Sequence, residues 1–205
     1  MMWSRRRWCM AGAVVGLALA AGFAGRADAK TVVVLPRPGQ VGIGMQGQFG
    51  TLLDGAKLGS EFAAGPGLTV RLRYRMRYER AIGFSFESQT FDARNPQPPD
   101  SLFAPERLTF ITAGVEFYKL YGTRTRTTRM LSLGLGLAQV SERLRDGETF
   151  YPNDGLYLSA GAGVERFFWN SWAWDLSARY MTVFQNGETN HDLQASLGLI
   201  FYASY

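Results

Sequence analysis

The stretch Leu68–Tyr78, LTVRLRYRMRY, decides the fold. Its apolar positions are Leu68, Val70, Leu72, Tyr74, Met76 and Tyr78, and its polar positions are Thr69, Arg71, Arg73, Arg75 and Arg77. This strict period of two fits a β-strand with one apolar and one cationic face, and no helix has it. In a soluble barrel or sandwich the apolar face would point inward. In a membrane barrel it would face lipid, and the arginines would fill the interior.

The first 29 residues have the features of a secretory signal peptide. Three arginines at 5–7 precede an apolar run over 9–24, and Ala27-Asp28-Ala29 forms a cleavage site of the A-x-A type. We predict a signal peptide at 1–29 and a barrel domain at 30–205. The alternative is a retained inner-membrane anchor, which the short run rich in Gly and Ala disfavours. The one cysteine, Cys9, precedes the predicted cleavage site, so the mature chain has no disulfide and no thiol nucleophile.

The charge of the mature chain is close to neutral. Removal of residues 1–29 takes away four arginines and Asp28, which leaves 18 basic and 16 acidic residues. Such a dispersed, nearly balanced charge gives no reason to expect nucleic-acid binding. No apolar run of about 20 residues follows the signal peptide, so any membrane span must be built from strands.

The mature chain contains eight alternating segments, which predict an all-β, eight-stranded antiparallel up-and-down transmembrane β-barrel. They cover residues 41–49, 68–78, 82–87, 108–118, 131–138, 156–165, 172–180 and 193–205. Long connections follow the first, third, fifth and seventh segments, and short turns follow the others. Bacterial outer-membrane barrels have this asymmetry, with short turns in the periplasm and long loops outside. Both termini are then expected in the periplasm.

The non-apolar faces indicate that the apolar faces meet lipid. In the fifth, sixth and eighth segments these faces are mainly Ser, Gly and Ala, which suit the narrow interior of an eight-stranded barrel better than a surface in water. Aromatic residues also gather beside the short turns, as in an interfacial girdle. They are Tyr78, Tyr118, Tyr121, Phe168, Trp169, Trp172 and Trp174.

The inward-facing charges predict an ion-pair network. Its predicted members are Arg71, Arg73, Arg75, Arg77, Glu87, Glu116, Glu165, Asp175 and Arg179. A three-residue turn at 79–81 would place Arg73 opposite Glu87. Because unpaired buried charges are costly and the interior is narrow, we expect a plug in the half near the short turns and no continuous water channel.

The pattern resembles the small outer-membrane barrels, namely the OmpA transmembrane domain, OmpX and OmpW families. The last segment, with Leu197, Leu199, Phe201 and Tyr205, is similar to the assembly signal that these proteins present to the barrel-insertion machinery, although Ala203 stands where an aromatic is usual. The resemblance implies a monomer in the outer membrane of a Gram-negative-type bacterium, in contact with outer-membrane lipid and holding no cofactor. It transfers no ligand motif.

No catalytic, cofactor-binding or metal site is assigned. Some eight-stranded barrels modify lipid A, and the deacylases carry a His-x-Ser pair, but the single histidine, His191, is followed by Leu193 at the serine position. We expect His191 to be a solvated loop residue. Glu165 and Asp175 could form an acid/base pair, and the stronger interpretation makes them partners of the interior arginines.

Three functions follow from different classes of protein. The first is a non-enzymatic envelope or surface-interaction protein that binds an unidentified extracellular ligand through its loops. The second is an OmpW-like conduit for small apolar molecules, with Leu52, Leu53, Leu58 and Phe62 as its point of access. The third, a lipid A-modifying enzyme, has the least support.

Overall fold

The computed structural model describes residues 38–53, 61–94, 105–144, 149–185 and 188–203. The predicted signal peptide, Leu58 and Tyr205 lie outside these residues. No helix in the described part of the chain is long and apolar enough to cross a membrane.

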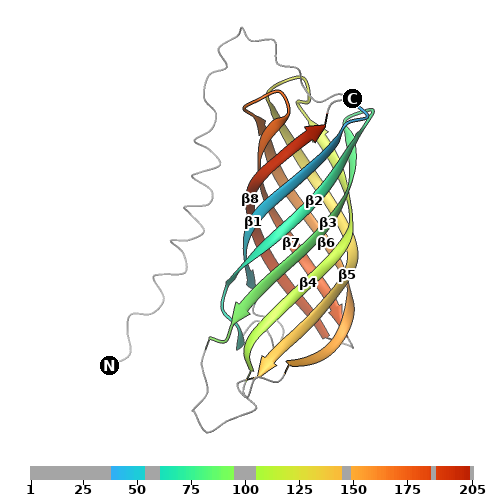
Figure 1. The fold of residues 1–205 in the computed structure, drawn as a ribbon. Coiled ribbons are helices and arrows are strands. Elements are labelled where there is room, and N and C mark those ends of the chain that lie inside the picture. Colours follow the sequence, from blue (N-terminus) through green and yellow to red (C-terminus); the bar gives the residue numbers. More distant parts are fainter. Residues whose placement is uncertain (1–37, 54–60, 95–104, 145–148, 186–187, 204–205) are drawn as a thin grey trace, which may run out of the picture. The chain divides into compact units, whose positions relative to one another are not determined.

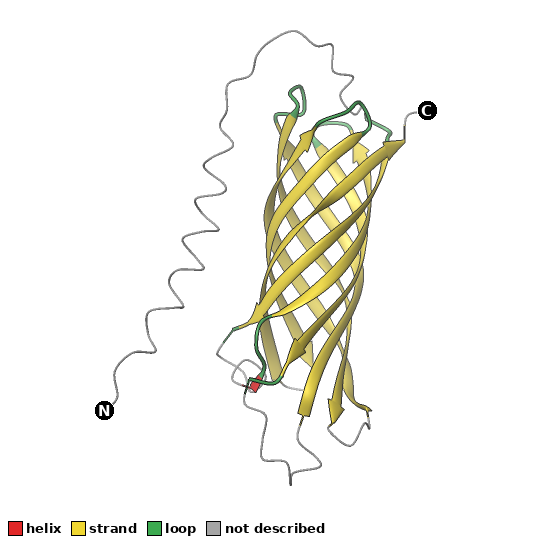
Figure 2. Ribbon diagram, turned by 60° about the vertical axis from the view of Figure 1, so that its left-hand side comes forward, coloured by secondary structure: helices red, strands yellow, loops and turns green. Residues whose placement is uncertain are grey.

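Eight strands form one closed antiparallel barrel in sequence order, and β1 pairs with β8 to complete the ring (Figure 1). The strands are β1 (Val41–Leu52), β2 (Gly65–Met76), β3 (Arg80–Asp92), β4 (Pro105–Tyr121), β5 (Thr127–Leu144), β6 (Thr149–Phe167), β7 (Trp172–Gln185) and β8 (Glu188–Ala203). The predicted fold class is therefore confirmed. Figure 2 shows the strands tilted about the barrel axis, with the three short turns at the end where β8 finishes.

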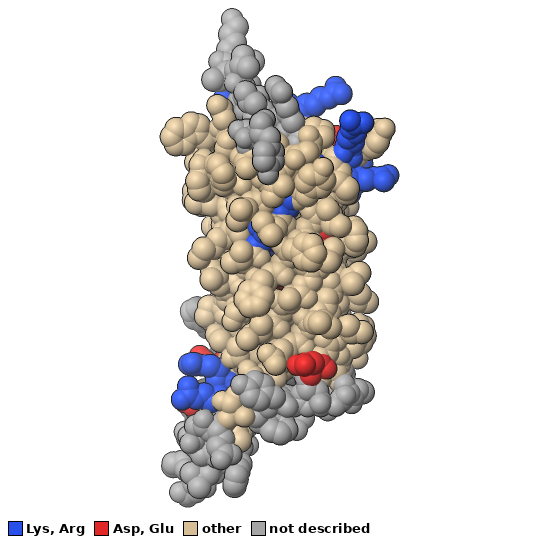
Figure 3. Space-filling view, turned by 45° about the vertical axis from the view of Figure 1, so that its right-hand side comes forward, with Lys and Arg blue, Asp and Glu red and all other residues tan. Residues whose placement is uncertain are grey.

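The barrel is apolar outside and polar inside. Leu133 and Leu135 of β5 are 65% and 52% exposed, whereas Arg73 of β2 is 0% exposed. The period of two in the sequence thus sorts each strand into an outward apolar face and an inward face. In the face shown in Figure 3, charged side chains gather at the two ends, and the middle is largely free of them. This is the arrangement of a transmembrane barrel, because lipid replaces water around its middle.

The strands run further than the sequence suggested. β5 and β6 have 18 and 19 residues. The connections that follow β5 and β7 therefore span only 145–148 and 186–187, and the prediction of long loops there is wrong. Asn186-Gly187 is a strong hairpin-turn signal, and it shows why a long loop is not needed after β7. Long connections remain at 53–64 and 93–104.

The turn between β2 and β3 corrects the predicted register. β2 ends at Met76, which pairs with Arg80, so the turn comprises residues 77–79. Arg73 consequently lies opposite Gly83, and the predicted pairing of Arg73 with Glu87 is wrong. Tyr78 and Glu79 adopt positive φ angles of 60° and 55°. Since left-handed turns usually carry Gly or Asn, nothing in the sequence marked this one.

Three apolar clusters and a polar middle fill the barrel. Two clusters lie at the short-turn end, one with Ala81, Tyr118, Leu120 and Met130 and the other with Phe167, Ala173, Ile200 and Tyr202. The third lies at the opposite end, where the long connections begin. Small residues make room for the large ones: a Cβ at Gly42 would lie 2.7 Å from the Tyr202 ring.

Candidate functional site

The polar middle of the barrel is the candidate site, and β2 supplies most of its cations. Alternation along β2 directs Arg71, Arg73 and Arg75 inward, and all three are at most 5% exposed. In a ring of eight strands, β6 lies across the barrel from β2. The long arginine side chains therefore cross toward the small residues of the opposite wall.

At the short-turn end, two carboxylates hold two arginines. Arg73 donates to Glu165 Oε2 at 2.6 Å and to Asp175 Oδ2 at 2.8 Å, and Arg75 donates to Glu165 Oε1 at 2.5 Å. Glu165 and Asp175 are direct partners in the pairing of β6 with β7, and both are 0% exposed. Two carboxylates side by side repel each other, and the contacts with the two arginines offset this repulsion.

Aromatic rings enclose these arginines. The Arg73 guanidinium lies 4.4 Å from the centre of the Tyr118 ring, and that of Arg75 lies 4.7 Å from the Tyr202 ring. The Tyr202 hydroxyl donates to Glu165 at 2.9 Å. Tyr118, which we predicted to belong to the outer aromatic girdle, is 4% exposed and faces the interior. Tyr118 lies two residues after inward-facing Glu116 on β4, so strand alternation directs its side chain inward as well.

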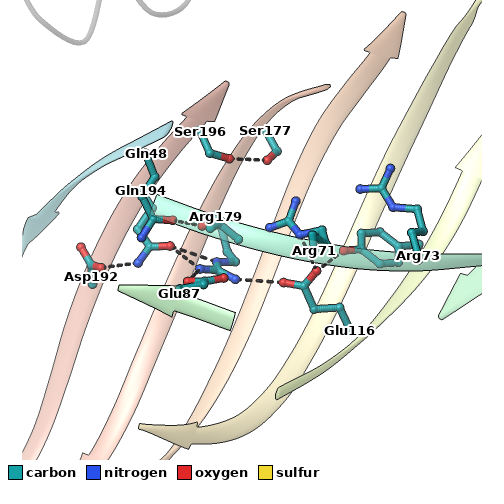
Figure 4. Close-up of polar contacts among 12 residues, drawn as sticks. Gln48, Arg71, Arg73, Glu87, Glu116, Ser177, Arg179, Asp192, Gln194 and Ser196 are labelled. Atoms are coloured by element: carbon teal, nitrogen blue, oxygen red, sulfur yellow. Dashed lines mark hydrogen bonds and ion pairs between the residues drawn. The ribbon is translucent and has the colours of Figure 1, made fainter. Parts of the chain in front are cut away.

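In the middle of the barrel, Arg179 of β7 joins carboxylates from two other strands (Figure 4). It donates to Glu116 Oε1 at 2.9 Å and also to Glu87 Oε2. Arg71 Nε approaches Glu116 Oε2 at 3.1 Å, which is an ion-pair contact without hydrogen-bond geometry. The Tyr118 hydroxyl donates to the same carboxylate.

Amides continue the polar layer toward the long connections. Gln194 accepts a hydrogen bond from Arg179, and its own amide group donates to Gln89 at 2.8 Å and to Asp192 at 2.7 Å. Asp192 is 1% exposed, and one of its carboxylate oxygens has no hydrogen-bond partner among the described residues. Alternation over 193–205 places Gln194 on the inward face, but no sequence pattern marks Gln89, Asp192 or Gln194 as members of a polar network.

Positive and negative charges are equal in number within the interior ion-pair network. Four arginines and four carboxylates make up the interior ion-pair network as the structure has it, namely Arg71, Arg73, Arg75, Arg179, Glu87, Glu116, Glu165 and Asp175. The prediction that Arg77 is a ninth member is wrong, because Arg77 lies in the exposed turn after β2. The shorter β2 moves Arg77 out of the strand and so out of the barrel.

An apolar plug fills the barrel at the end of the long connections. It comprises Leu52, Phe62, Phe91, Leu108, Phe110, Ala138, Val140, Tyr157, Met181 and Val183. The rings of Phe91 and Phe110 meet edge to face, with their centres 5.5 Å apart. Phe62 comes from the connection after β1 and is held by a bridge to Ala93 and by a hydrogen bond from Arg94 to its carbonyl at 2.8 Å. Phe110, Ala138 and Tyr157 already lie on the inward faces of predicted segments. Continued beyond the predicted ends, the same alternation reaches Phe91, Val140, Met181 and Val183.

The polar middle of the described barrel contains one small cavity at its centre. A cavity of about 10 Å³ lies among Arg71, Tyr118, Ser177 and Arg179. That volume is at the lower limit for one water molecule. Buried apolar clusters lie on both sides of this polar middle, toward the two ends of the barrel.

The remaining predicted residues lie elsewhere. His191 belongs to β8 rather than to a loop, and its Nδ1 lies 2.7 Å from the Tyr180 hydroxyl, with the two rings stacked. Phe201 is outward-facing and packs on Trp172 at 5.1 Å between ring centres. Within the described ranges, no group of three or more His, Cys, Asp or Glu residues could hold a metal ion.

No protein-family model matches this sequence, and no curated protein matches it. The fold, however, is similar to solved outer-membrane barrels. Neisserial surface protein A has a TM-score of 0.62 and 15% identity, with 78% of this chain and 96% of that chain covered. Ail, the attachment invasion locus protein of Yersinia pestis, has a TM-score of 0.56 and 15% identity, with 82% and 100% covered.

A third similar structure was determined in a membrane. The outer membrane protein AlkL, studied in DMPC lipid bilayers, has a TM-score of 0.51 and 14% identity, with 88% of this chain and 97% of that chain covered. At these identities the likeness concerns the fold alone. It confirms the resemblance in architecture to the small outer-membrane barrels.

Proposed function

We propose that this chain is an integral outer-membrane protein whose barrel is a closed anchor and whose function lies at the end of the long connections. The observation that carries the proposal is the filled interior. The interior ion-pair network and the apolar plug lie in series along the barrel, so solutes have no straight path. The outward apolar face supports the membrane location.

The proposal includes export and orientation. The signal peptide at 1–29 is cleaved, the barrel-insertion machinery assembles the chain as a monomer, and the short turns and both termini face the periplasm. The similar folds of a neisserial surface protein and of an attachment protein support an action at the cell surface on an extracellular ligand. We assign no enzymatic activity.

Planar-bilayer recording of the refolded protein tests the closed barrel. We expect silence, because the charges are paired and the cavity holds no more than one water. Large, stable conductance steps would contradict the proposal. Mass spectrometry of lipid A from cells with and without the protein tests the enzyme alternative, since a changed acyl pattern would establish lipid modification.

The conduit for apolar molecules has lost part of its predicted point of access. Leu52 and Phe62 are 2% and 0% exposed and belong to the apolar plug. Leu53 is half-buried and bonded through its backbone N–H to the His191 carbonyl at 2.9 Å. Uptake of a small apolar dye into protein-containing vesicles, at a rate above that of empty vesicles, would favour the conduit over the closed anchor.

A further inference from the structure

The exposed charges at the short-turn end of the barrel are almost all basic. An arc of outward-facing cations on four adjacent strands, here called the basic collar, comprises Arg80 on β3, Lys119 on β4, Arg129 on β5 and Arg166 on β6. Arg77, Arg124 and Arg126 of the adjoining turns are exposed as well. Glu79 is the only exposed acidic residue at this end of the described chain, and it lies 3.9 Å from Lys119.

The opposite end carries a mixture of both signs. Exposed Arg107 and Arg143 are direct partners across β4 and β5, and Arg107 forms an ion pair with Asp92 at 3.0 Å. Glu106 and Asp154 are exposed there too. Figure 3 shows this difference, with basic side chains gathered at the upper end and both signs at the lower end. The collar is therefore a feature of one end of the barrel rather than of its whole rim.

The collar lies at the level of the aromatic girdle. Arg166 is the direct partner of Trp174, and Arg129 is the direct partner of Tyr121. Tyr and Trp side chains mark the depth of lipid headgroups in transmembrane barrels. Since no described carboxylate lies within ion-pair distance of Arg129 or Arg166, their charge is available to a headgroup phosphate.

An apolar groove lies on the outer wall between the collar and the middle of the barrel. It has a volume of about 380 Å³ and is lined by Phe117, Leu133, Leu135, Leu158, Ala160 and Tyr180. Ala160 forms its floor between Leu133 and Tyr180, and the next outward position on β6 is Ala162, which pairs with Ala178 of β7. These three alanines extend the low surface beside the groove by one outward position, and Val164 then separates it from Arg166.

The distances suit a membrane lipid. Leu133 follows Arg129 of the collar by four residues of β5, which is about 13 Å along the strand and about 10 Å in depth at the usual tilt of a barrel strand. One leaflet contributes about 15 Å of hydrocarbon to a bilayer. We propose that this surface binds an anionic phospholipid, with the phosphate at Arg129 and Arg166 and one acyl chain in the groove over Ala160. Charge complementarity selects the headgroup, and the groove selects a chain-bearing lipid over free phosphate.

Native mass spectrometry of the protein released from vesicles tests the site. The vesicles contain equal amounts of phosphatidylglycerol and phosphatidylcholine with the same acyl chains. We expect phosphatidylglycerol adducts to exceed phosphatidylcholine adducts on the order of tenfold, because each basic side chain near an anionic lipid contributes about one factor of five. Equal adducts would overturn the proposal.

Matched variants assign the preference to the collar. Arg129→Gln/Arg166→Gln should bring the ratio near one, whereas Arg107→Gln/Arg143→Gln, on neighbouring strands at the other end, should keep it. A loss of preference in both variants, or in neither, would overturn the assignment. Ala160→Leu, which fills the groove, should reduce adducts of both lipids, and unchanged adducts would overturn the placement of the chain.

A last arm separates two anionic lipids. Vesicles in which lipid A replaces phosphatidylglycerol should give adducts that do not depend on Arg129 and Arg166. A stronger collar-dependent preference for lipid A would overturn the assignment to a two-chain phospholipid.

Discussion

Arg73 is the residue on which the interior depends most. It is 0% exposed and donates to both Glu165 and Asp175. Arg73→Met keeps a long side chain but leaves two neighbouring carboxylates short of a cation. We expect the free energy of unfolding to fall by about 3–5 kcal/mol, as for other broken buried pairs. Urea titration in zwitterionic vesicles, followed by tryptophan fluorescence, measures the change.

The matched control for Arg73 is Arg77. Arg77 lies in the turn after β2 and is exposed, so Arg77→Met should change the free energy of unfolding by no more than about 0.5 kcal/mol. Equal losses in the two variants would mean that Arg77 also points into the barrel.

The partner of Glu87 offers a second prediction at this scale. Arg179 donates to Glu87, whereas Arg73 lies opposite Gly83. A double-mutant cycle of Arg179→Met with Glu87→Gln should give a coupling energy above about 0.5 kcal/mol. The same cycle with Arg73 in place of Arg179 should give additive losses, and coupling there would restore the register first predicted from the sequence.

At the residue scale, sequence predicted which side chains face inward better than which of them meet. Parity alone places Arg71, Glu116 and Asp175 in the interior, because it depends only on each strand's own alternation. The pairing of Arg73 required the length of a turn and the stagger of four strands, which no local pattern carries. Gln89 and Asp192 lie beyond the ends of the predicted segments 82–87 and 193–205, whereas alternation within 193–205 already places Gln194 inside.

At the scale of single elements, the turn after β2 contains avoidable strain. Glu79 holds a φ of 55°, which costs a residue with a Cβ about 1–2 kcal/mol unless it is Asn or Gly. Glu79→Asn should therefore raise the free energy of unfolding by about 0.5–1 kcal/mol. Arg80→Asn, one residue later in the strand, provides the control and should give no increase. A faster-unfolding Glu79→Asn protein would contradict the turn geometry.

The outward face of β5 tests the membrane position. Leu135 is 52% exposed near the middle of the strand. Leu135→Arg should cost about 2–4 kcal/mol in folding into vesicles, and Leu131→Arg, two residues from Arg129 of the basic collar, should cost less than half as much. If both variants fold as readily as the wild type, the outer face does not contact lipid.

The number of strands, and which residues of each strand point inward, could be predicted from the sequence. The residues at which the strands end could not. The alternation over 131–138 is complete, so β5 was found, but its last residues, with Ser141, Glu142 and Arg143, look like a charged loop. They are strand because hairpins continue beyond the lipid once their partners are held in register. The alternation of apolar and polar residues depends on one face of the strand meeting an apolar environment. Where both faces of a strand meet water, the alternation is absent.

At the scale of the whole molecule, the interior ion-pair network and the apolar plug are two barriers in series. We therefore expect that removing one of them does not open the barrel to ions. Arg71→Ala/Arg179→Ala removes the middle of the interior ion-pair network but leaves the apolar plug in place. We expect this variant, when folded, to stay silent in planar-bilayer recording. A second variant also carries Phe91→Ala and Phe110→Ala in the apolar plug, and we expect it to show small conductance steps. Conductance from the arginine variant alone would show that the plug does not seal.

The pairing of β1 with β8 affects the order and rate of folding. Val41 pairs with Ala203, so the contact that closes the ring joins residues from opposite ends of the barrel sequence. Every other strand pair is a neighbour in the chain and can form as a local hairpin. Closure of such a distant pair is slow, and until it happens β1 and β8 present unpaired edges on which other chains can add. The protein is therefore most prone to aggregate after β8 has formed and before β8 pairs with β1.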